Sequence, residues 1–334
     1  MENKRVLITG SAGFVGSHLV DHILANTDWH IIGLDSFKHR GDSLRLVGKN
    51  PERYDIYTHD LTTPISDRLI NKIGHVDYII NMASESHVDR SITEPVEFCE
   101  NNFKLVLTML EYARKSKPEF FIQISTDEVY GAALDNHNHK EWERILPSNP
   151  YSASKASQEA MCISYWRTYK LPIVITNTMN LLGEGQDMEK FLPTLIRKIY
   201  RGEEVTIHGS EKCIGSRFYL HARNQADALL FILKNTTPTI YYDTMDQIIV
   251  PDRYNVVGDI ELNNLELAQM VAEILNKPLY YVLEDFHKQR SGHDRRYALD
   301  GTKLKEMGWI APMSFEESLI KIINWTLAHP EWLE

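Results

Sequence analysis

The sequence predicts an α/β fold in which a doubly wound parallel sheet is followed by a smaller C-terminal α/β lobe. Short apolar runs alternate with helical patterns through the first half of the chain, a glycine-rich turn joins the first strand to the first helix, and this rhythm loosens after about residue 180. Parallel strands need crossover connections, so such alternation specifies a sheet with helices on both faces. We expect one domain at residues 1–180 and the lobe at residues 181–334, with some exchange of chain between them.

Each expected element follows from a local pattern. Apolar runs predict strands at residues 5–9, 29–34, 54–58, 78–82, 120–125 and 173–177. Helical periodicity predicts helices at residues 17–24, 151–169 and 188–201. In the lobe we expect short strands at residues 205–207 and 254–257 and helices at residues 264–275 and 315–328. The lobe should close over the carboxyl edge of the sheet, where open α/β sheets bind ligands.

Composition and charge narrow the range of partners. The 334 residues include 43% hydrophobic residues and carry a formal net charge of -10, which argues against a nucleic-acid surface. No apolar stretch is long enough to span a bilayer, so we expect no membrane partner. The cysteines Cys99, Cys162 and Cys213 lack paired or metal-like spacing, and Lys4-Arg5 leads directly into a strand without a cleavage site. We therefore expect a reduced, cytoplasmic compartment and no metal.

Three glycines mark a dinucleotide-binding turn of the Rossmann type. Gly10 permits a tight turn, Gly13 lets a pyrophosphate approach the backbone, and Gly16 lets helix and strand pack closely. Glycines used only for packing are the plainer alternative, but this triple follows a strand and precedes a helix. The expected cofactor contacts in the turn are Gly10, Gly13, Phe14, Val15 and Gly16.

An acid at the end of the second strand indicates which dinucleotide is bound. Asp35 lies about 20 residues after the turn, where a carboxylate can bind the adenosine ribose hydroxyls and repel a 2′-phosphate. It favours NAD over NADP, although Lys38 and Arg40 lie close enough to keep the alternative open. Asp60 and Leu61 follow the third strand as expected adenine contacts, and a turn or cap is the ordinary use of such an acid.

A tyrosine and a lysine at helical spacing lie downstream of two adjacent acids. In Tyr151-Ser-Ala-Ser-Lys155 the lysine lies one turn below the tyrosine, so its cation can lower the pKa of the phenol and make it a usable base. Asp127 and Glu128 end an apolar strand, and two neighbouring carboxyl groups in a closed site tend to share a proton between them. A solvated turn and a surface helix face are the plainer alternatives for these two pairs.

With these residues the chain resembles the extended short-chain dehydrogenase/reductase superfamily and, within it, the nucleotide-sugar 4,6-dehydratases. The resemblance covers nearly the whole chain. It implies NAD as cofactor, a nucleotide-sugar substrate, and a homodimer formed through helices at residues 102–115 and 152–169. The acid pair is specific, because epimerases of the superfamily usually lack it. The segments that carry the resemblance are Ala83-Ser-Glu-Ser-His-Val-Asp-Arg-Ser91, Ser125-Thr-Asp-Glu-Val-Tyr-Gly131, Pro150-Tyr-Ser-Ala-Ser-Lys-Ala156 and Ser291-Gly-His-Asp-Arg-Arg-Tyr297.

The resemblance also implies how dTDP-glucose or UDP-glucose would become a 4-keto-6-deoxy sugar. Tyr151 and Lys155 would act with NAD to oxidise C4, while Thr126 helps to hold the 4-oxygen. The resulting ketone acidifies C5. Glu128 would then take the C5 proton and Asp127 would protonate the departing C6 hydroxyl, after which the hydride returns to C6. NAD would be regenerated in each turnover.

Contacts with the nucleotide sugar are expected from the same resemblance. Arginines can hold a diphosphate bidentately, and Arg217 matches the family's phosphate-binding arginine. A surface ion pair is the plainer use of each charged residue here, and a helix cap is the plainer use of Asn102. The expected substrate-binding residues are Ser86, Arg90, Asn102, Asn180, Arg217, Arg290 and His293, and Ala83 is expected beside the cofactor.

Two segments depart from the family's pattern near the nucleotide. Residues 180–184 read Asn-Leu-Leu-Gly-Glu and residues 217–222 read Arg-Phe-Tyr-Leu-His-Ala, so the base and the sugar stay open. A nucleotide-sugar 4-epimerase is the nearest alternative function, because it would share Tyr151, Lys155 and the glycine turn, but it needs no acid pair. A UDP-glucuronate decarboxylase is another, and it needs a basic partner for the C6 carboxylate. A catalytically idle dinucleotide-binding regulator would have no chemical need for all four of Asp127, Glu128, Tyr151 and Lys155.

Overall fold

The computed structural model describes residues 3–38, 41–210, 213–244, 247–284 and 294–332. Its main feature is a seven-stranded sheet in the order β11-β6-β5-β4-β1-β2-β3, in which every neighbouring pair is parallel. The order runs outward from β1 in two directions, so the sheet has a switch point between β1 and β4 where ligands bind in such folds. The strands are β1 (Arg5–Thr9), β2 (His30–Asp35), β3 (Tyr54–Thr58), β4 (Tyr78–Asn81), β5 (Phe120–Thr126), β6 (Ile173–Thr178) and β11 (Asp252–Val256).

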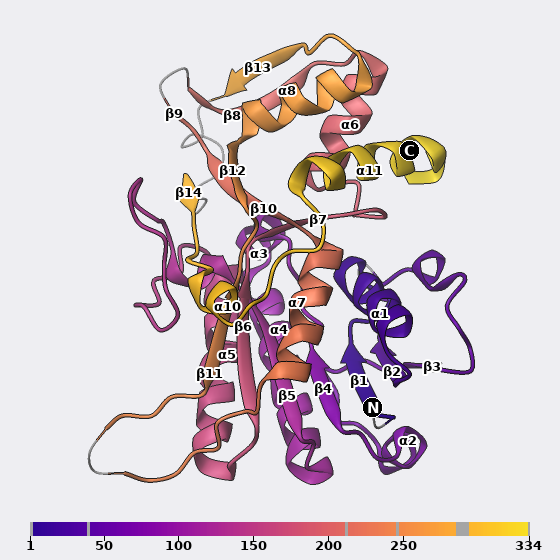
Figure 1. The fold of residues 1–334 in the computed structure, drawn as a ribbon, viewed down its shortest axis with the longest axis vertical. Helices are drawn as coiled ribbons and strands as arrows, with labels where there is room; N and C mark the ends of the chain where they lie inside the picture. The colour runs from indigo at the N-terminus through magenta and orange to yellow at the C-terminus, as the bar shows by residue number, and fades with distance from the viewer. Residues whose placement is uncertain (1–2, 39–40, 211–212, 245–246, 285–293, 333–334) are drawn as a thin grey trace.

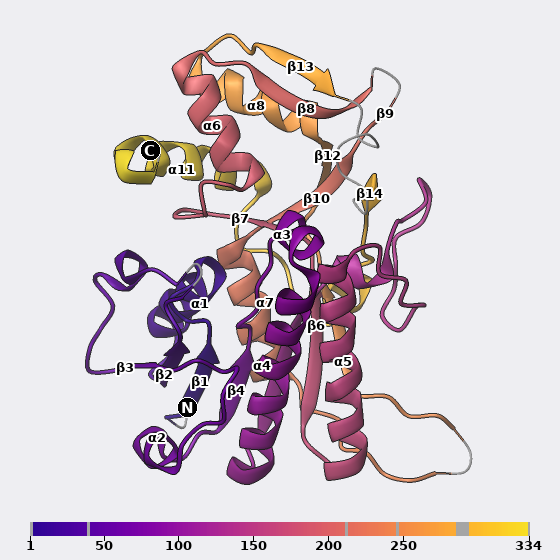
Figure 2. The same ribbon diagram turned by 180° about the vertical axis from the view of Figure 1, so that it is seen from behind.

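Helices cover both faces of this sheet (Figures 1 and 2). On one face lie α1 (Phe14–Asn26) and α7 (Ala222–Asn235), which pack on strand residues such as Val6 and Ile8. On the other face lie α2 (Asp67–Ile73), α4 (Pro95–Ser116) and α5 (Pro150–Tyr169), which pack on strand residues such as Leu7. Alternate strand residues point to opposite faces, so a strand buried on both sides must be apolar throughout, as β1 is. The predicted doubly wound fold is confirmed.

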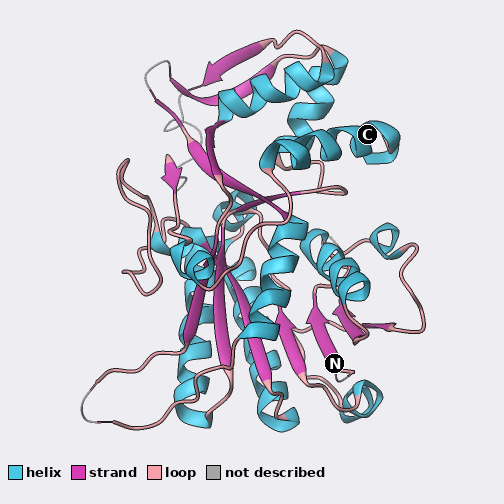
Figure 3. Ribbon diagram, viewed as in Figure 1, coloured by secondary structure: helices cyan, strands magenta, loops and turns pink. Residues whose placement is uncertain are grey.

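A smaller lobe sits above the carboxyl ends of the main strands (Figure 3). Its core is formed by Leu195, Ile207, Leu267 and Leu319 with their neighbours. Two short sheets build it: β12-β10-β14 with β7 beside β10, and β13-β8-β9. Its strands are β7 (Asn180–Leu182), β8 (Val205–Ser210), β9 (Cys213–Ile214), β10 (Ser216–His221), β12 (Ile260–Asn263), β13 (Tyr281–Glu284) and β14 (Arg296–Tyr297). Its helices are α6 (Phe191–Arg201), α8 (Asn264–Leu275) and α11 (Phe315–Ala328).

Helix boundaries follow local capping signals. Asn149 caps α5 through a reciprocal box with Ser152, and Asn263 and Ser314 start α8 and α11 in the same manner. The bounds of α8 and α11 coincide with those predicted. Short helical segments complete the chain at α3 (Val88–Thr93), α10 (Thr302–Glu306), η1 (Ser43–Leu46), η2 (Asp127–Tyr130) and η3 (Pro330–Trp332).

The strand predicted at residues 254–257 does not belong to the lobe. It is β11, the edge strand of the main sheet, paired in parallel with β6. The prediction was wrong about its location because α7, which no prediction covered, serves as the crossover between the lobe and β11. Arg253 in this strand is fully buried and forms an ion pair with Glu159 of α5, with Nη2 and Oε2 2.6 Å apart. Part of the chain beyond residue 180 thus completes the first sheet.

In the described part of the chain, none of the helices combines the length and the apolar character that crossing a membrane requires.

Candidate active site

The glycine turn has the geometry that a dinucleotide phosphate needs. Gly10 has a φ of 71°, and a Cβ at Gly16 would lie 2.0 Å from the Gly10 carbonyl oxygen, so neither position tolerates a larger residue. Gly13 precedes α1, and no side chain caps this helix. Phe14, Val15 and Gly16 form its first turn, where amide groups and the helix dipole favour an anion. A Cβ at Gly10 would also lie 3.1 Å from the backbone of Ala83, so Ala83 borders the turn.

Asp35 is the last residue of β2 and lies beside the glycine turn. Its Oδ2 accepts a hydrogen bond of 2.9 Å from the Ala12 amide, and its Oδ1 accepts one of 2.9 Å from the Phe37 amide. The carboxylate is therefore fixed against the glycine turn, where the adenosine ribose is expected. This is the position from which it would repel a 2′-phosphate.

Lys38, which kept NADP open as an alternative, is ion-paired with Asp60. Partial burial acts to raise the pKa of Asp60, but hydrogen bonds from Lys38 and Thr62 outweigh it and hold that pKa at about 2. Asp60 also accepts a hydrogen bond from the Thr62 amide, so it serves as the turn residue that the sequence offered as the alternative to an adenine contact. Leu61 beside it is buried. Arg40 lies outside the described residues.

The acid pair stands at the carboxyl end of β5. Asp127 is 3% exposed, and its Oδ1 accepts hydrogen bonds from Thr126 Oγ1 at 2.8 Å and from the Glu128 amide at 3.0 Å. Its Oδ2 is buried without a hydrogen-bond partner among the described residues. Glu128 Oε2 accepts a hydrogen bond of 3.1 Å from Asn149 Nδ2 and one of 3.4 Å from the Tyr297 hydroxyl. The pair is thus a buried feature and not a solvated turn.

Both acids have pKa values above the ordinary range of a carboxyl group. Burial, reinforced by the charge of Glu128, raises the pKa of Asp127 to about 7. Burial also raises the pKa of Glu128, while the hydrogen bond from Asn149 and the charge of Arg217 act in the opposite direction. A carboxylic acid that titrates near pH 7 can give or take a proton in a working enzyme.

Tyr151 and Lys155 lie on α5 beside this pair. The Tyr151 hydroxyl is hydrogen-bonded with the Thr126 side chain, and its ring packs edge-on against Phe98. The pKa of Tyr151 is raised, chiefly by burial and then by Glu128, whereas the Tyr-x-x-x-Lys spacing predicted a lowered pKa. The lysine is buried and directed elsewhere, with Nζ donating to the Ile124 carbonyl oxygen at 2.8 Å and to Gln158 Oε1 at 2.7 Å. Desolvation lowers the pKa of Lys155 to about 8.

A buried chain of hydrogen bonds connects Lys155 to the glycine turn. Gln158 Oε1 accepts from both Lys155 Nζ and Gln123 Nε2, at 2.7 and 3.1 Å. Gln123 in turn accepts from Asn81 Nδ2 at 2.8 Å, and Asn81 Oδ1 accepts from Thr9 Oγ1 at 2.8 Å. Sequence reasoning missed this relay, because its members lie on β1, β4, β5 and α5 and share no local motif.

Asn102 is placed within α4 and not at its start. The helix begins at Pro95, so the cap alternative for Asn102 was wrong; the signal that was overlooked is a proline at the first helical position. The Asn102 side chain is fully buried, accepts from the Glu85 amide at 2.9 Å and donates to Ser154 Oγ at 2.9 Å. It fastens the segment that carries Ser86 to helix α5.

The other expected substrate residues occupy different settings. Arg90 Nη1 lies 3.1 Å from Glu85 Oε2, and Arg90 Nε lies 3.1 Å from Glu94 Oε2. Asn180 is exposed at the start of β7, beside Tyr219 of β10. Arg290 and His293 lie outside the described residues.

Arg217 faces the acid pair from β10. Its Nη1 and Nη2 donate to the carbonyl oxygens of Arg295 and Asp294, each at 2.7 Å, and its guanidinium lies 4.5 Å from the centre of the Tyr297 ring. Its positive charge acts to lower the pKa values of Asp127 and Glu128, against the larger effect of burial. The structure therefore brings Arg217 to the acids, although its contacts here are with the backbone of the segment around β14.

Three residues near the acids were missed by sequence reasoning. Asn149 and Tyr297 contact Glu128, and Lys190 Nζ donates to the Ser86 carbonyl oxygen at 3.3 Å while its charge acts on Glu128. Asn149 directly precedes the segment that begins at Pro150, and Tyr297 is the last residue of the segment 291–297. Both segments carried the resemblance, so these two residues could have been considered as site residues. Lys190 offered no such signal, because only the lobe brings it back to the sheet.

Comparison with known proteins places this geometry in a family. A model of the NAD dependent epimerase/dehydratase family matches residues 6–242. The chain belongs to the NAD dependent epimerase/dehydratase family. The family uses NAD, and the glycine cradle, the uncapped start of α1 and the fixed carboxylate of Asp35 fit that cofactor.

Individual relatives match over nearly their whole length. The chain is 33% identical over 328 residues to the low-salt glycan biosynthesis protein Agl12 of Haloferax volcanii, covering 98% of this chain and 99% of that protein. It is 33% identical over 358 residues to a dTDP-glucose 4,6-dehydratase of Escherichia coli, covering 98% and 95%. A dTDP-glucose 4,6-dehydratase from Streptomyces venezuelae, solved with NAD bound, superimposes with a TM-score of 0.86 at 30% identity, covering 99% and 100%. Nucleotide-sugar 4,6-dehydratases are thus among the proteins that this member of the family resembles.

Proposed function

We propose that this family member is a nucleotide-sugar 4,6-dehydratase, a hydro-lyase that converts dTDP-glucose or UDP-glucose into the 4-keto-6-deoxy sugar. The observation that carries the proposal is the pair Asp127, which is buried, and Glu128, which is partly buried; both carboxyl groups have raised pKa values and lie at the carboxyl end of β5. Relatives with that activity match almost the entire chain, which supports it. When bound, NAD accepts a hydride from C4 of the sugar and returns it at C6.

The residues of α5 and β5 would handle the proton at the C4 oxygen. Tyr151 takes this proton during oxidation, and Thr126, which is hydrogen-bonded with the Tyr151 hydroxyl, holds the same oxygen in line. Lys155 contacts Ile124 and Gln158 and not Tyr151, so its part in the proposed reaction would be the longer-range effect of its positive charge on a developing phenolate.

The acid pair would then remove water across C5 and C6. Burial makes Glu128 a stronger base than an exposed glutamate, so it is suited to take the C5 proton that the ketone has acidified. With a pKa of about 7, Asp127 retains its proton in a large share of molecules at neutral pH. Its Oδ2 has no partner within the described residues, so it can donate this proton to the departing C6 hydroxyl.

Around this centre, residues 1–180 would bind NAD and residues 181–334 would bind most of the nucleotide sugar. Arg217 and, by resemblance, Arg290 and His293 would hold the diphosphate, and Asn180 would lie by the nucleotide. Ser86 and Arg90 would line the sugar pocket, with Asn102 fixing their segment from behind. We further propose a cytoplasmic homodimer in which α4 and α5, adjacent on one face of the sheet (Figure 2), pair with the same helices of a second copy.

The test is mass spectrometry of reactions with dTDP-glucose and UDP-glucose in heavy water. We expect a product lighter by one water that carries solvent hydrogen at C5, with activity on both nucleotides. The variant Glu128→Gln should lower the elimination rate by roughly 100-fold or more with little change in KM, because it removes a base used in the transition state. Glu204→Gln, at an exposed position before β8, is the matched control and should behave like the parent.

The nearest alternative gives a different result in the same experiment. A 4-epimerase would yield a product of unchanged mass, and a decarboxylase would leave both glucose nucleotides untouched while acting on UDP-glucuronate. Either outcome, or a dehydrated product that keeps its original C5 hydrogen, would overturn the roles given to Asp127 and Glu128.

A further inference from the structure

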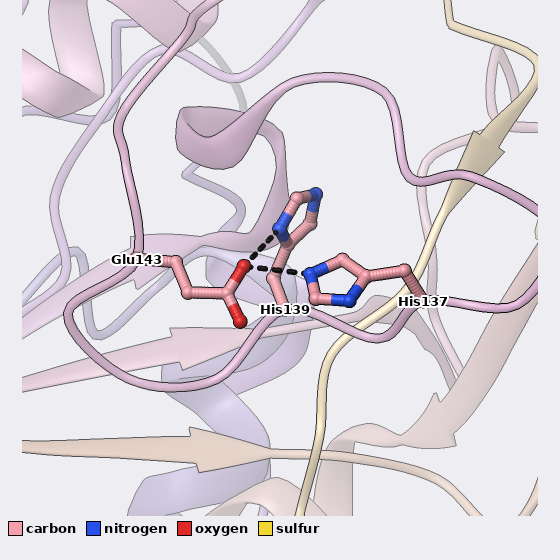
Figure 4. Close-up of side chains that lie close together, drawn as sticks. All are labelled: His137, His139 and Glu143. Carbon is pink, nitrogen blue, oxygen red and sulfur yellow. Dashed lines mark hydrogen bonds and ion pairs between the residues drawn. The ribbon is translucent and has the colours of Figure 1, made fainter.

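A cluster of metal-ligating side chains lies outside the active site, in the segment between η2 and α5 (Figure 4). His137 Nε2 lies 2.7 Å and His139 Nδ1 lies 2.9 Å from the same carboxylate oxygen, Oε2 of Glu143. The two nitrogens and this oxygen all lie within 4.8 Å of one another. The three side chains converge on one point although they come from one irregular loop.

The donor set matches a divalent transition metal of the zinc class. Zinc takes imidazole nitrogen and carboxylate oxygen at about 2.0–2.2 Å, and sites with two histidines and one glutamate are well known for it. Tetrahedral ligands at that bond length lie about 3.3 Å apart. The oxygen of Glu143 needs to move about half an ångström from each imidazole to admit the ion, and His137 can adjust because nearly half of its side chain is exposed.

The backbone that presents these ligands is already fixed. The His139 amide donates to the Ala298 carbonyl oxygen at 2.9 Å, and the His139 carbonyl oxygen accepts from the Asp300 amide at 2.8 Å, which makes a bridge to Leu299. Arg296 Nη1 donates to the His137 carbonyl oxygen at 2.8 Å. Ligands on fixed backbone lose little freedom when an ion binds, which favours affinity.

The side chains are also oriented before any ion binds. The His139 ring stacks on Tyr130 with ring centres 5.3 Å apart, and its Nε2 is buried without a hydrogen-bond partner among the described residues. Only Nδ1 therefore faces the cluster. The second oxygen of Glu143 accepts from the Lys140 amide at 3.0 Å, which holds the carboxylate in place.

Glu143 supplies the carboxylate oxygen of the set, and the two imidazole nitrogens lie 2.7 and 2.9 Å from it. Our expectation that the chain holds no metal rested on the spacing of its cysteines, which says nothing about a His-x-His-x-x-x-Glu pattern.

We propose that His137, His139 and Glu143 form a binding site for a divalent transition metal, with zinc as the reference ion and water completing its coordination. The site would be structural. Its loop ends at Asn149, which donates to Glu128, and Arg296 next to the loop precedes Tyr297, which contacts the same acid. An ion here would therefore stiffen two segments that position Glu128.

The experiment is isothermal titration of the full-length, chelator-treated protein with zinc chloride, followed by thermal unfolding with and without zinc. We expect one equivalent bound with a dissociation constant below about 10 μM, and a raised Tm because the ion binds the folded state. His137→Ala and Glu143→Gln should each weaken binding by about tenfold or more, since each removes a ligand. His137 is exposed enough for its variant to fold, and circular dichroism checks this.

The matched control is His75→Ala. His75 is another exposed histidine beside a carboxylate, with Nε2 3.2 Å from Asp77 Oδ1, but among the described residues it has one carboxylate partner and no second imidazole. This variant should bind zinc like the parent. Absence of binding by the parent, equal binding by all four proteins, or loss of binding in His75→Ala alone would each overturn the proposed site.

Discussion

Asparagine at position 127 should make the folded protein more stable at neutral pH while abolishing most of the activity. An amide keeps the acceptor oxygen that Thr126 Oγ1 and the Glu128 amide use, and it places a donor where the protonated carboxyl has one. It lacks the charge that burial disfavours. The Asp127 carboxyl group that the proposed reaction needs is therefore one that lowers the stability of the folded protein at neutral pH.

The magnitude follows from the pKa of Asp127. The group titrates at about 7 in the folded protein against 3.8 in a model compound, a difference of roughly 3 pH units. The folded state thus binds more protons than the unfolded state between these values, so parental stability falls as pH rises from about 4 to 7. At about 1.4 kcal/mol per pH unit, Asp127 lowers the free energy of unfolding of the parent by about 4 kcal/mol at pH 7 and by about 1.6 kcal/mol at pH 5.

Urea unfolding of the NAD-free parent and Asp127→Asn at pH 5 and pH 7 measures this difference. The advantage of the variant should grow by about 2 to 3 kcal/mol between the two pH values. Asp60→Asn is the control, because Lys38 lowers the pKa of Asp60 and the stability from that pair is lost only as pH falls from about 4 toward 2; its difference from the parent should therefore stay constant between pH 5 and pH 7. If the parent and Asp127→Asn kept a constant difference, Asp127 would be ionised in the folded protein and could not be the acid.

Two more predictions concern the lysine and the cofactor. Replacing Gln158 with Leu removes the side-chain acceptor of Lys155 Nζ and the donor to the Asn102 carbonyl oxygen, so we expect kcat to fall with little change in KM and a loss of about 1 to 3 kcal/mol in unfolding free energy. Gln158→Glu keeps the acceptor and should restore most of kcat; failure to do so would mean that the donor to Asn102 matters more than the acceptor of Lys155. NADP should support little activity compared with NAD, because we expect the Asp35 carboxylate to lie beside the adenosine ribose and repel a 2′-phosphate. Asp35→Ala should reduce the preference for NAD by about tenfold or more in kcat/KM, and an unchanged ratio would mean that another residue discriminates between the cofactors.

The sequence predicted the first half of the fold well because its signals are local. Strands buried on both faces read as short apolar runs, and the turn after β1 needs its glycines for reasons visible in a few residues. β11 could not be placed in the same way, since its pairing with β6 depends on a crossover through α7 and on the partner of Arg253, about 90 residues away. Local patterns indicate a strand but not its neighbours.

In the candidate site, too, the residues that lie in local motifs were predicted and the contacts between distant segments were not. Asp127, Glu128, Tyr151 and Lys155 lie within two short segments, so their proximity could be inferred from one strand and the helix that follows. The groups that set their pKa values come from elsewhere in the chain. The direction of the Tyr151 pKa was mispredicted because spacing along a helix gives the separation of two residues, whereas burial and the contacts of Lys155 with Ile124 and Gln158 decide the balance.

The buried ion pair between Glu159 and Arg253 has a consequence for biosynthesis. Glu159 lies on the same helix as Tyr151 and Lys155, but its counter-charge leaves the ribosome about 90 residues later. Until then the carboxylate lacks its ion-pair partner, and breaking a buried ion pair by removing one member costs roughly 3 to 5 kcal/mol. Helix α5 is therefore expected to dock firmly only after β11 has been made. A nascent chain that stopped near residue 180 would carry both of these proposed catalytic side chains on a helix that is not yet docked, so the N-terminal part should not reach its final structure before the rest.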